Sequence, residues 1–286
     1  MTHSSTEMIA HRGYAGVAPE NTLPAFEAVA DGRHPAPMIE FDVMPTRDGD
    51  IAIFHDLRLD NRGLSVNRGI TDASGVIWET STETIKQARV LGSDAGIPLL
   101  EEVVDAVPPA IGLNVELRNP GTYEMRFGEA VGADVVSRQR THWDPFVADV
   151  IDVLDGADHD LLFSSFSESA IAAVRDIAPE FPVGVNVHDS IDDGLEILDR
   201  YEGEYIHPRL NMIKGTPFFE SPYGSVQDPD FGDIDLVSEA HDRDAGVNVW
   251  TVTTWHQASL LQSAGVDGLI ADYPGLDRFN MNDSIE

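Results

Sequence analysis

Short apolar stretches alternate with helix-like stretches along most of this 286-residue chain, and this alternation most limits how it can fold. Each apolar stretch has the length of a β-strand, and most are followed by apolar residues at helical spacing. Strands that pair in parallel need a crossover of about a dozen residues or more, usually a helix. Eight such strands are expected: residues 8–11, 38–43, 111–117, 161–165, 183–187, 205–207, 247–252 and 268–271.

Eight strands with room for a crossover helix in seven connections predict a (β/α)₈ barrel of the TIM type. The alternative is a doubly wound open sheet. Polar residues follow several predicted strands, and TIM barrels carry their active sites at the C-terminal strand ends, which favours the barrel. We expect a single domain over residues 1–286, with an insertion at about 57–97. Residues 119–142 are expected to be a long polar loop, and Asp144-Pro145 to begin a helix.

One further strand is expected directly after the second, because Asp48-Gly49 is a strong hairpin-turn signal. Pairing that is symmetric about this turn places His55 opposite Asp42. Glu40 and Asp42 share one face of the strand, since side chains alternate. Clustered carboxylates repel one another and must be paired or bound to a cation. The hairpin therefore indicates a metal site with an acid–base group beside it, although an ordinary solvated sheet face accounts for the same residues.

Other chemically active side chains are expected at the same end of the predicted barrel. Three carboxylates form an oxygen-rich site suited to Mg²⁺ or Ca²⁺. Two histidines can act as general base and general acid near neutral pH, and two arginines can hold phosphate. Together they indicate metal-dependent hydrolysis of a phosphate ester. The residues are His11, Arg12, Glu40, Asp42, His55, Glu116 and Arg118.

Charge and composition exclude several classes of function. The chain has 50 acidic and 18 basic residues, a net charge of −32, and only two lysines, Lys86 and Lys214. A dispersed acidic surface indicates adaptation to high salt, the alternative being an ordinary acidic protein. It argues against partners such as nucleic acid and against stable association with a membrane. The absence of cysteine argues against a structural zinc site. With no apolar span and no signal peptide at residues 1–7, we expect a cytoplasmic protein.

Eight motifs occur in order along the chain. They are His11-Arg12-Gly13, Glu20-Asn21-Thr22, Glu40-x-Asp42-Val43 with Thr46-x-Asp48-Gly49, His55-Asp56, Ile97-Pro98-x-Leu100-Glu101-Glu102, Asn114-x-Glu116, Ser165-Phe166 and Trp250-Thr251-Val252. This ordered series resembles the glycerophosphodiester phosphodiesterase family. The resemblance implies a TIM-type barrel with a small insertion after the His-Asp motif. It also implies hydrolysis of a small-molecule glycerophosphodiester to glycerol phosphate and an alcohol, dependent on a divalent metal.

The resemblance also implies which residues perform the chemistry. His11 and His55 match the catalytic pair. One divalent ion, Mg²⁺ or Ca²⁺ with Mn²⁺ as a further candidate, is expected on the three residues that match the metal ligands. These are Glu40, Asp42 and Glu116.

Five further positions are expected to bind or support the substrate. Arg12 matches the phosphate-contacting arginine, and Glu20 and Asn21 match a motif that buttresses the site. Arg118 stands where the family usually has lysine; we expect a phosphate contact, the alternative being a salt bridge to a neighbouring acid. Trp250 is expected to fill the barrel or to form a wall under the glycerol, rather than to act as a catalytic group.

Three questions stay open at this point. The alternatives to a glycerophosphodiesterase are a phospholipase- or lysophospholipase-D-like enzyme of the same barrel superfamily and a non-catalytic phosphate-binding relative. Thr253 stands where the family often has asparagine, which concerns the choice of substrate. The protein is expected to be a monomer or a homo-oligomer. His207 is expected to be a packed histidine, the alternative being that it reaches the pocket, and His188 is expected to be a surface residue.

Overall fold

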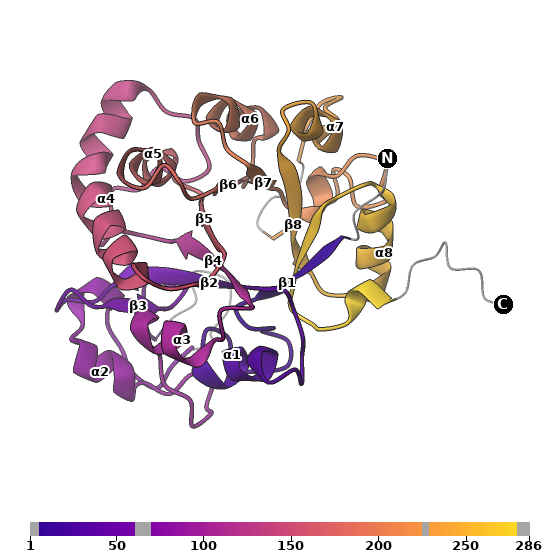
Figure 1. The fold of residues 1–286 in the computed structure, drawn as a ribbon. Coiled ribbons are helices and arrows are strands. Elements are labelled where there is room, and N and C mark those ends of the chain that lie inside the picture. Colours follow the sequence, from indigo (N-terminus) through magenta and orange to yellow (C-terminus); the bar gives the residue numbers. More distant parts are fainter. Residues whose placement is uncertain (1–5, 61–69, 225–228, 279–286) are drawn as a thin grey trace.

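The computed structural model describes residues 6–60, 70–224 and 229–278 (Figure 1). Residues 1–5, in which no signal peptide is expected, and residues 61–69 of the expected insertion lie outside this range. The strands are β1 Glu7–His11, β2 Met38–Pro45, β3 Ile51–Ile53, β4 Gly112–Leu117, β5 Leu161–Ser165, β6 Val183–Asn186, β7 Tyr205–His207, β8 Gly246–Val252 and β9 Gly268–Ala271. The α-helices are α1 Leu23–Ala30, α2 Thr82–Gln87, α3 Leu100–Ala106, α4 Ala133–Leu154, α5 Glu168–Ile177, α6 Ile191–Arg200, α7 Leu236–His241 and α8 Trp255–Ser263.

Eight of the strands form a closed parallel barrel. β2 and β4 to β9 pair in order, β9 pairs with β1, and the pairing of β1 with β2 closes the ring. Helices surround the strands (Figure 1). The (β/α)₈ barrel is confirmed, and each predicted strand begins and ends within two residues of its expected limits. In the described part of the chain, no helix combines the length and hydropathy needed to cross a bilayer.

The hairpin between β2 and β3 has a different register from the predicted one. Val43 pairs with Ile53, so the residue opposite Asp42 is Phe54 and not His55. The Phe54 N–H donates to the backbone carbonyl of Asp42 at 3.0 Å. The loop explains the shift, because it contains an odd number of residues, from Thr46 to Asp50. The Thr46 N–H donates to the Asp50 carbonyl at 2.8 Å, and the Thr46 hydroxyl accepts from the Asp50 N–H. The prediction that His55 faces Asp42 across the ladder is therefore wrong.

The segment after β4 also differs from its prediction. The expected loop over 119–142 is helical from residue 133, so Asp144-Pro145 lies inside α4 and does not begin it. A proline within a helix costs about 3 kcal/mol. Burial of one large apolar side chain contributes about 1.5–3 kcal/mol, and α4 buries several along one stripe, which offsets that cost. They are Val136, Trp143, Phe146, Val147, Val150 and Leu154.

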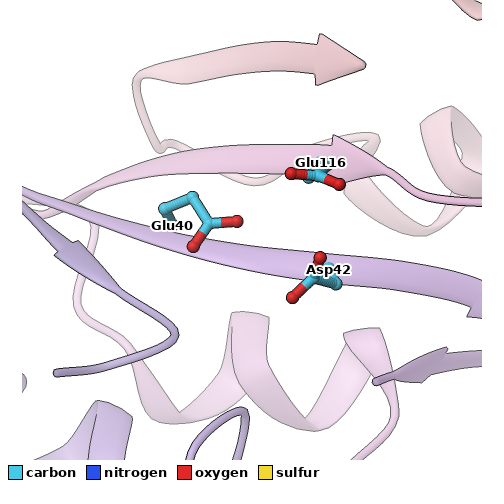
Figure 2. A group of neighbouring side chains, drawn as sticks. All are labelled: Glu40, Asp42 and Glu116. Atoms are coloured by element: carbon cyan, nitrogen blue, oxygen red, sulfur yellow. The ribbon is translucent and has the colours of Figure 1, made fainter. Parts of the chain in front are cut away.

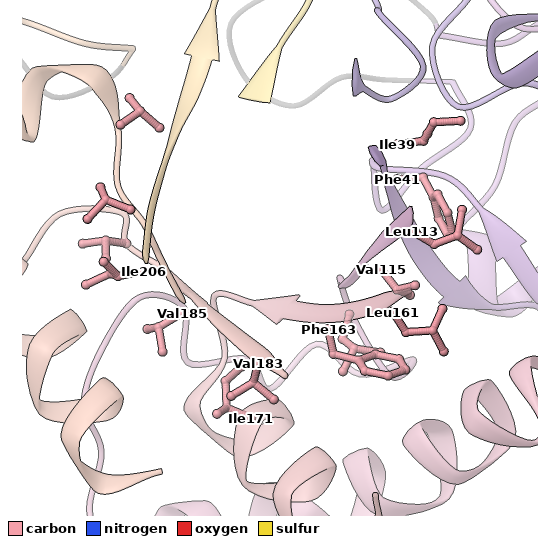
Figure 3. Packing of buried hydrophobic residues seen from close by; sticks show 14 of the residues in the cluster. Ile39, Phe41, Leu113, Val115, Leu161, Phe163, Ile171, Val183, Val185 and Ile206 are labelled. Atoms are coloured by element: carbon pink, nitrogen blue, oxygen red, sulfur yellow. The ribbon is translucent and has the colours of Figure 1, made fainter. Parts of the chain in front are cut away.

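The two faces of each barrel strand have different chemistry. On β2, Glu40 and Asp42 lie beside Glu116 of β4 (Figure 2). The alternate residues Ile39 and Phe41 are fully buried on the other face, where strands and helices pack together (Figure 3). The apolar core thus lies between the strands and the surrounding helices, while the inside of the barrel receives polar groups.

A second, smaller apolar cluster lies under the hairpin. It joins side chains of β2 and β3 to those of the segment that precedes α3. Its buried members are Met44, Ala52, Phe54, Leu59, Ile70, Ile77, Ile85, Ala88, Val90, Ile97 and Leu99. Because Phe54 is a member, this cluster anchors the backbone next to His55. That residues 57–97 form an insertion within one domain stays a prediction.

Candidate active site

Three carboxylates from neighbouring strands form the centre of the candidate site. Asp42 lies directly across from Glu116 in the parallel ladder, and Glu40 lies two residues before Asp42 on β2. One carboxylate oxygen of each lies within 4.8 Å of the others (Figure 2). Burial and then the charges of Asp42 and Glu116 raise the pKa of Glu40 well above its usual range. Burial and the charge of Asp42 raise the pKa of Glu116 to about 7.

This cluster has the chemistry of a divalent cation site. All of its donors are carboxylate oxygens, which Mg²⁺, Ca²⁺ and Mn²⁺ prefer. Buried like charges so close together are unfavourable unless a cation neutralises them. Within the described residues, Asp42 Oδ1 is buried and has no hydrogen-bond partner. The three residues therefore fit the predicted metal ligands.

A tight turn after β1 brings Arg12 to this cluster. Arg12, Gly13 and Tyr14 all have left-handed backbone conformations, with φ of 51°, 74° and 66°. Such conformations cost free energy in residues other than glycine and are maintained only where the surroundings demand them. At Gly13 a Cβ atom would lie 2.8 Å from the Cβ of Ala25, so only glycine fits. The turn directs the Arg12 N–H to Glu40 Oε2, 3.1 Å away.

The Arg12 side chain is held from two sides. Its Nη1 donates to Glu20 Oε1 at 2.7 Å, and its Nε lies 3.3 Å from Asp42 Oδ2. Asn21 Nδ2 donates to the same Asp42 oxygen at 2.9 Å. Burial lowers the pKa of Arg12, but Asp42, Glu20 and Glu40 outweigh it, so the guanidinium stays charged. The structure thus brings the predicted buttress, Glu20 and Asn21, behind Arg12 and Asp42.

Each candidate catalytic histidine is paired with an aspartate. His11 Nδ1 lies 2.6 Å from Asp272 Oδ1, and His55 Nδ1 lies 2.8 Å from Asp56 Oδ1. A carboxylate on Nδ1 holds the proton there, so the Nε2 atom is the one that can accept a proton. His11 Nε2 lies 3.9 Å from Glu40 Oε2, at the carboxylate cluster. The arrangement therefore suits both imidazoles for proton transfer and places His11 next to the cluster.

The pairing of His11 with Asp272 leads to a testable expectation. The change Asp272→Asn is expected to lower kcat about a hundredfold or more, with little change in KM, because an amide no longer enforces the reactive tautomer. Steady-state kinetics on a phosphodiester of the kind that the sequence motifs imply measures both constants. Asp267→Asn is the matched control, because Asp267 pairs with His241 at 2.8 Å outside the candidate site. Equal losses in the two variants would show that Asp272 acts only through stability.

Arg118 lies between the carboxylates and an aromatic wall. Its Nη1 donates to Glu116 Oε1 at 3.0 Å, and its Nε donates to the His55 carbonyl at 3.2 Å. Its guanidinium carbon lies 5.2 Å and 5.7 Å from the ring centroids of Phe127 and Phe166. The salt bridge considered for Arg118 is therefore present, and the residue also lines the cavity described next. Contact with phosphate stays a prediction.

A cavity of about 260 Å³ gathers most of the predicted site residues. Three predicted residues lie behind this lining: Glu20, Asn21 and Asp42. Glu20 accepts a hydrogen bond from Arg12, and Asn21 donates one to Asp42 of the carboxylate cluster. Trp250 forms part of its wall, and its Nε1 donates to the His207 carbonyl at 2.7 Å. The predicted residues in the lining are His11, Arg12, Glu40, His55, Glu116, Arg118 and Trp250.

His207 is buried as predicted and also lines the cavity. Its Nε2 is 3.1 Å from Asn248 Nδ2, and the glycine at position 184 leaves room for its ring, since a Cβ there would meet the imidazole at 2.7 Å. Burial lowers the pKa of His207 to about 3. The ring is therefore uncharged at neutral pH.

Burial of His207 predicts a loss of stability in mild acid. Its pKa is about 3 in the folded protein, whereas an exposed histidine of the unfolded chain has a pKa of 6.5. Between these two values the unfolded chain binds the extra proton, so stability falls as pH falls. At pH 5 the loss is about 2 kcal/mol. Urea unfolding of wild type and His207→Gln at pH 7 and pH 5 gives the free energy of unfolding at each pH. The wild type is expected to lose more of it between pH 7 and pH 5 than the variant does. His142 is exposed on α4, so His142→Gln is the control variant. The same loss of unfolding free energy between pH 7 and pH 5 in wild type and His207→Gln would contradict the prediction.

Several residues in or beside the cavity were not predicted from the sequence. Asp272 follows β9 directly, so its position at a strand end was the available signal. The prediction that His188 is a surface residue was incomplete, because it lines the cavity and contacts the rings of Phe127 and Phe166. Phe127 lies in a segment without periodic pattern, which gave no signal. Asn186 could be recognised only once the barrel brings its Nδ2 within 3.1 Å of Glu116 Oε2.

Comparisons with known proteins show which family and fold this chain resembles. The sequence model of a protein family, described as the glycerophosphoryl diester phosphodiesterase family, matches residues 11–276. The chain is 28% identical to a glycerophosphodiester phosphodiesterase of Bacillus altitudinis, over 94% of this chain and 95% of the relative.

Solved structures show the same fold. A phosphodiesterase of Oleispira antarctica, solved in complex with the product sn-glycerol-3-phosphate, is 26% identical, with a TM-score of 0.69 over 94% of this chain and 93% of that one. A putative glycerophosphoryl diester phosphodiesterase of Silicibacter pomeroyi is 23% identical, with a TM-score of 0.72 over 96% and 92% of the two chains. The second likeness concerns the fold alone.

Proposed function

The chain belongs to the glycerophosphoryl diester phosphodiesterase family and is a glycerophosphodiester phosphodiesterase, and we propose that it acts through one divalent cation together with His11 and His55. The observation that carries the proposal is the convergence of both histidines on one cavity beside three clustered carboxylates. Each histidine has a carboxylate on Nδ1. The substrate is a small glycerophosphodiester, and the products are glycerol phosphate and an alcohol.

The proposed chemistry divides between the cation and the side chains. A divalent cation held by Glu40, Asp42 and Glu116 would supply Lewis-acid stabilisation of charge on the phosphoryl oxygens. Arg12 and Arg118 line the same cavity and add positive charge that favours a phosphate there. One histidine takes the proton of the attacking oxygen, and the other gives a proton to the departing alkoxide.

The attacking oxygen is proposed to be the substrate's own 2-hydroxyl. Its oxygen forms a bond to phosphorus while the bond from phosphorus to the alcohol oxygen breaks. The hydroxyl proton passes to one histidine, and the alcohol takes its proton from the other. Water then opens the cyclic phosphate in a second step to give glycerol phosphate. A 2-deoxy analogue is expected to resist hydrolysis, and normal turnover of that analogue would exclude this route in favour of direct attack by water.

The deciding experiment is release of glycerol phosphate from glycerophosphocholine and glycerophosphoethanolamine. Because we also propose that the acidic surface is an adaptation to salt, the assay is run across KCl concentrations up to multimolar. Parallel reactions with Mg²⁺, Ca²⁺ and Mn²⁺ would rank the metals. If folded, metal-loaded protein released nothing from either compound but cleaved a lysophospholipid, the substrate assignment would move to the lysophospholipase-D-like alternative.

A further inference from the structure

The cavity has a buried lining that the proposed chemistry does not use. We define this buried lining as Asn114, Ser164, Asn186, His207 and Ile270, which come from β4, β5, β6, β7 and β9. Each of these residues is at most 5% exposed. None carries a charge, since burial keeps His207 neutral. The buried lining therefore differs from the rest of the cavity, where carboxylates, histidines and arginines gather.

The main observation is that the side-chain amide of Asn114 is buried and has no hydrogen-bond partner within the described part of the chain. Among the described residues Asn114 is the only asparagine whose Oδ1 and Nδ2 are both buried without a hydrogen-bond partner. Asn186 donates from Nδ2 to Glu116 Oε2 at 3.1 Å, and its Oδ1 is also unpartnered. Buried amide groups without partners are rare and cost about 1–3 kcal/mol each. A fully buried amide that lines a cavity without an internal partner indicates that the ligand supplies one.

The chemistry of the buried lining determines what kind of group it accepts. A carboxamide both donates and accepts hydrogen bonds, as an alcohol does. An anionic phosphoryl group fits poorly there, because the buried lining has no cation and Asn114 is the ladder neighbour of Glu40. The cavity's cations are Arg12 and Arg118, outside the buried lining. Neutral hydroxyl groups are the part of a glycerophosphodiester that matches the amides.

From these observations we propose that Asn114, with Asn186, forms a hydroxyl-binding subsite that recognises the glycerol part of the substrate and positions the diester. The inference rests on the proposed function and deepens it. A buried site that hydrogen-bonds a substrate hydroxyl discriminates strongly against compounds without one, because its polar groups are then left unpaired. Selection for glycerol esters over other phosphodiesters thus comes from the amides rather than from the metal ligands.

The test compares two diesters in the metal-loaded enzyme. Asn114→Ala is expected to lower kcat/KM for glycerophosphocholine about 10- to 100-fold, because hydrogen bonds to the glycerol are lost. For the choline diester of 1,2-propanediol phosphate, which keeps the attacking 2-hydroxyl but lacks the terminal hydroxyl, the expected change is less than about threefold. Equal losses on both diesters would overturn the proposal, since Asn114 would then act through the carboxylate cluster. No loss on either would also overturn it.

A control variant separates binding from stability. Asn211 is likewise fully buried, has an unpartnered Oδ1 and is not part of the cavity lining. Asn211→Ala is expected to leave the ratio of the two kcat/KM values at the wild-type level. A change in that ratio as large as the one in Asn114→Ala would overturn the proposal, because loss of any buried amide would then produce it.

Ligand binding provides a readout that does not require turnover. Calorimetry with racemic glycerol phosphate and with methyl phosphate compares phosphate esters with and without hydroxyl groups. Wild type is expected to prefer glycerol phosphate, and Asn114→Ala to lose most of that preference. Retention of the preference by the variant would overturn the subsite. A wild-type enzyme that cleaves bis(p-nitrophenyl) phosphate but no glycerophosphodiester would instead refute the proposed function, and the calorimetry would still decide the subsite.

Discussion

His11→Ala is expected to lower kcat for glycerophosphocholine about 10³-fold, and His55→Ala by a similar factor. General acid–base catalysis by a positioned side chain contributes about 10² to 10⁴. Both histidines line the cavity, and His11 Nε2 lies near the carboxylate cluster, so each is placed to move a proton there. Steady-state rates of glycerol phosphate release measure the loss. A variant that kept more than about a tenth of the wild-type kcat would remove its histidine from the mechanism.

The same variants assign the two proton-transfer roles. A p-nitrophenyl ester of glycerol phosphate has a leaving group that departs without being protonated. Loss of the general acid should therefore matter little for this ester, while loss of the general base should matter as much as before. Exposed His142, on α4, provides the control variant His142→Ala, which is expected to keep full activity on both esters. Equal rescue of His11→Ala and His55→Ala would contradict a division into one acid and one base.

Removal of divalent cations with EDTA is expected to abolish turnover, and added Mg²⁺, Ca²⁺ or Mn²⁺ to restore it. The cation's stabilisation of transition-state charge amounts to several kcal/mol, which corresponds to about a thousandfold or more in rate. Asp42→Asn is expected to cause a loss of the same order and to raise the metal concentration needed for half-maximal activity. Full activity of metal-stripped protein would refute the role given to the carboxylate cluster.

Thermal unfolding tests the metal site without the reaction. A cation that binds the folded protein stabilises it by mass action, so Tm is expected to rise with metal concentration. Asp42→Asn should weaken this dependence. Glu101→Gln, at an exposed position on α3, is the matched control for the loss of one acidic charge. A Tm response unchanged in Asp42→Asn would locate the binding elsewhere.

The barrel could be predicted from the sequence because its strands are short, apolar and separated by helix-length segments. Side-chain alternation on β2 also placed Glu40 and Asp42 on one face, and the structure shows them together with Glu116. Partners distant in sequence could not be predicted in this way. His11 and Asp272 meet only because β9 pairs with β1 as the ring closes.

Errors arose where a local rule competed with tertiary packing or with hydrogen bonds inside a loop. Asp144-Pro145 has the form of a helix start, yet the buried stripe of α4 carries the helix through it. Asp48-Gly49 correctly marked a hairpin. The predicted register of this hairpin was wrong because the Thr46 hydroxyl accepts hydrogen bonds from the Asp48 and Asp50 N–H groups and so closes a five-residue loop. Residue type alone does not reveal these hydrogen bonds.

The two apolar clusters have a consequence for how activity responds to heat. His11 is the last residue of barrel strand β1, whereas the backbone beside His55 is anchored in the smaller cluster through Phe54. Segments of a protein can open separately, each with its own free energy, and a cluster with few members tends to open first. Transient opening of the smaller cluster would move His55 away while the ring of strands remained closed. Inactivation on warming is thus expected to be reversible at first and to precede cooperative melting of the barrel.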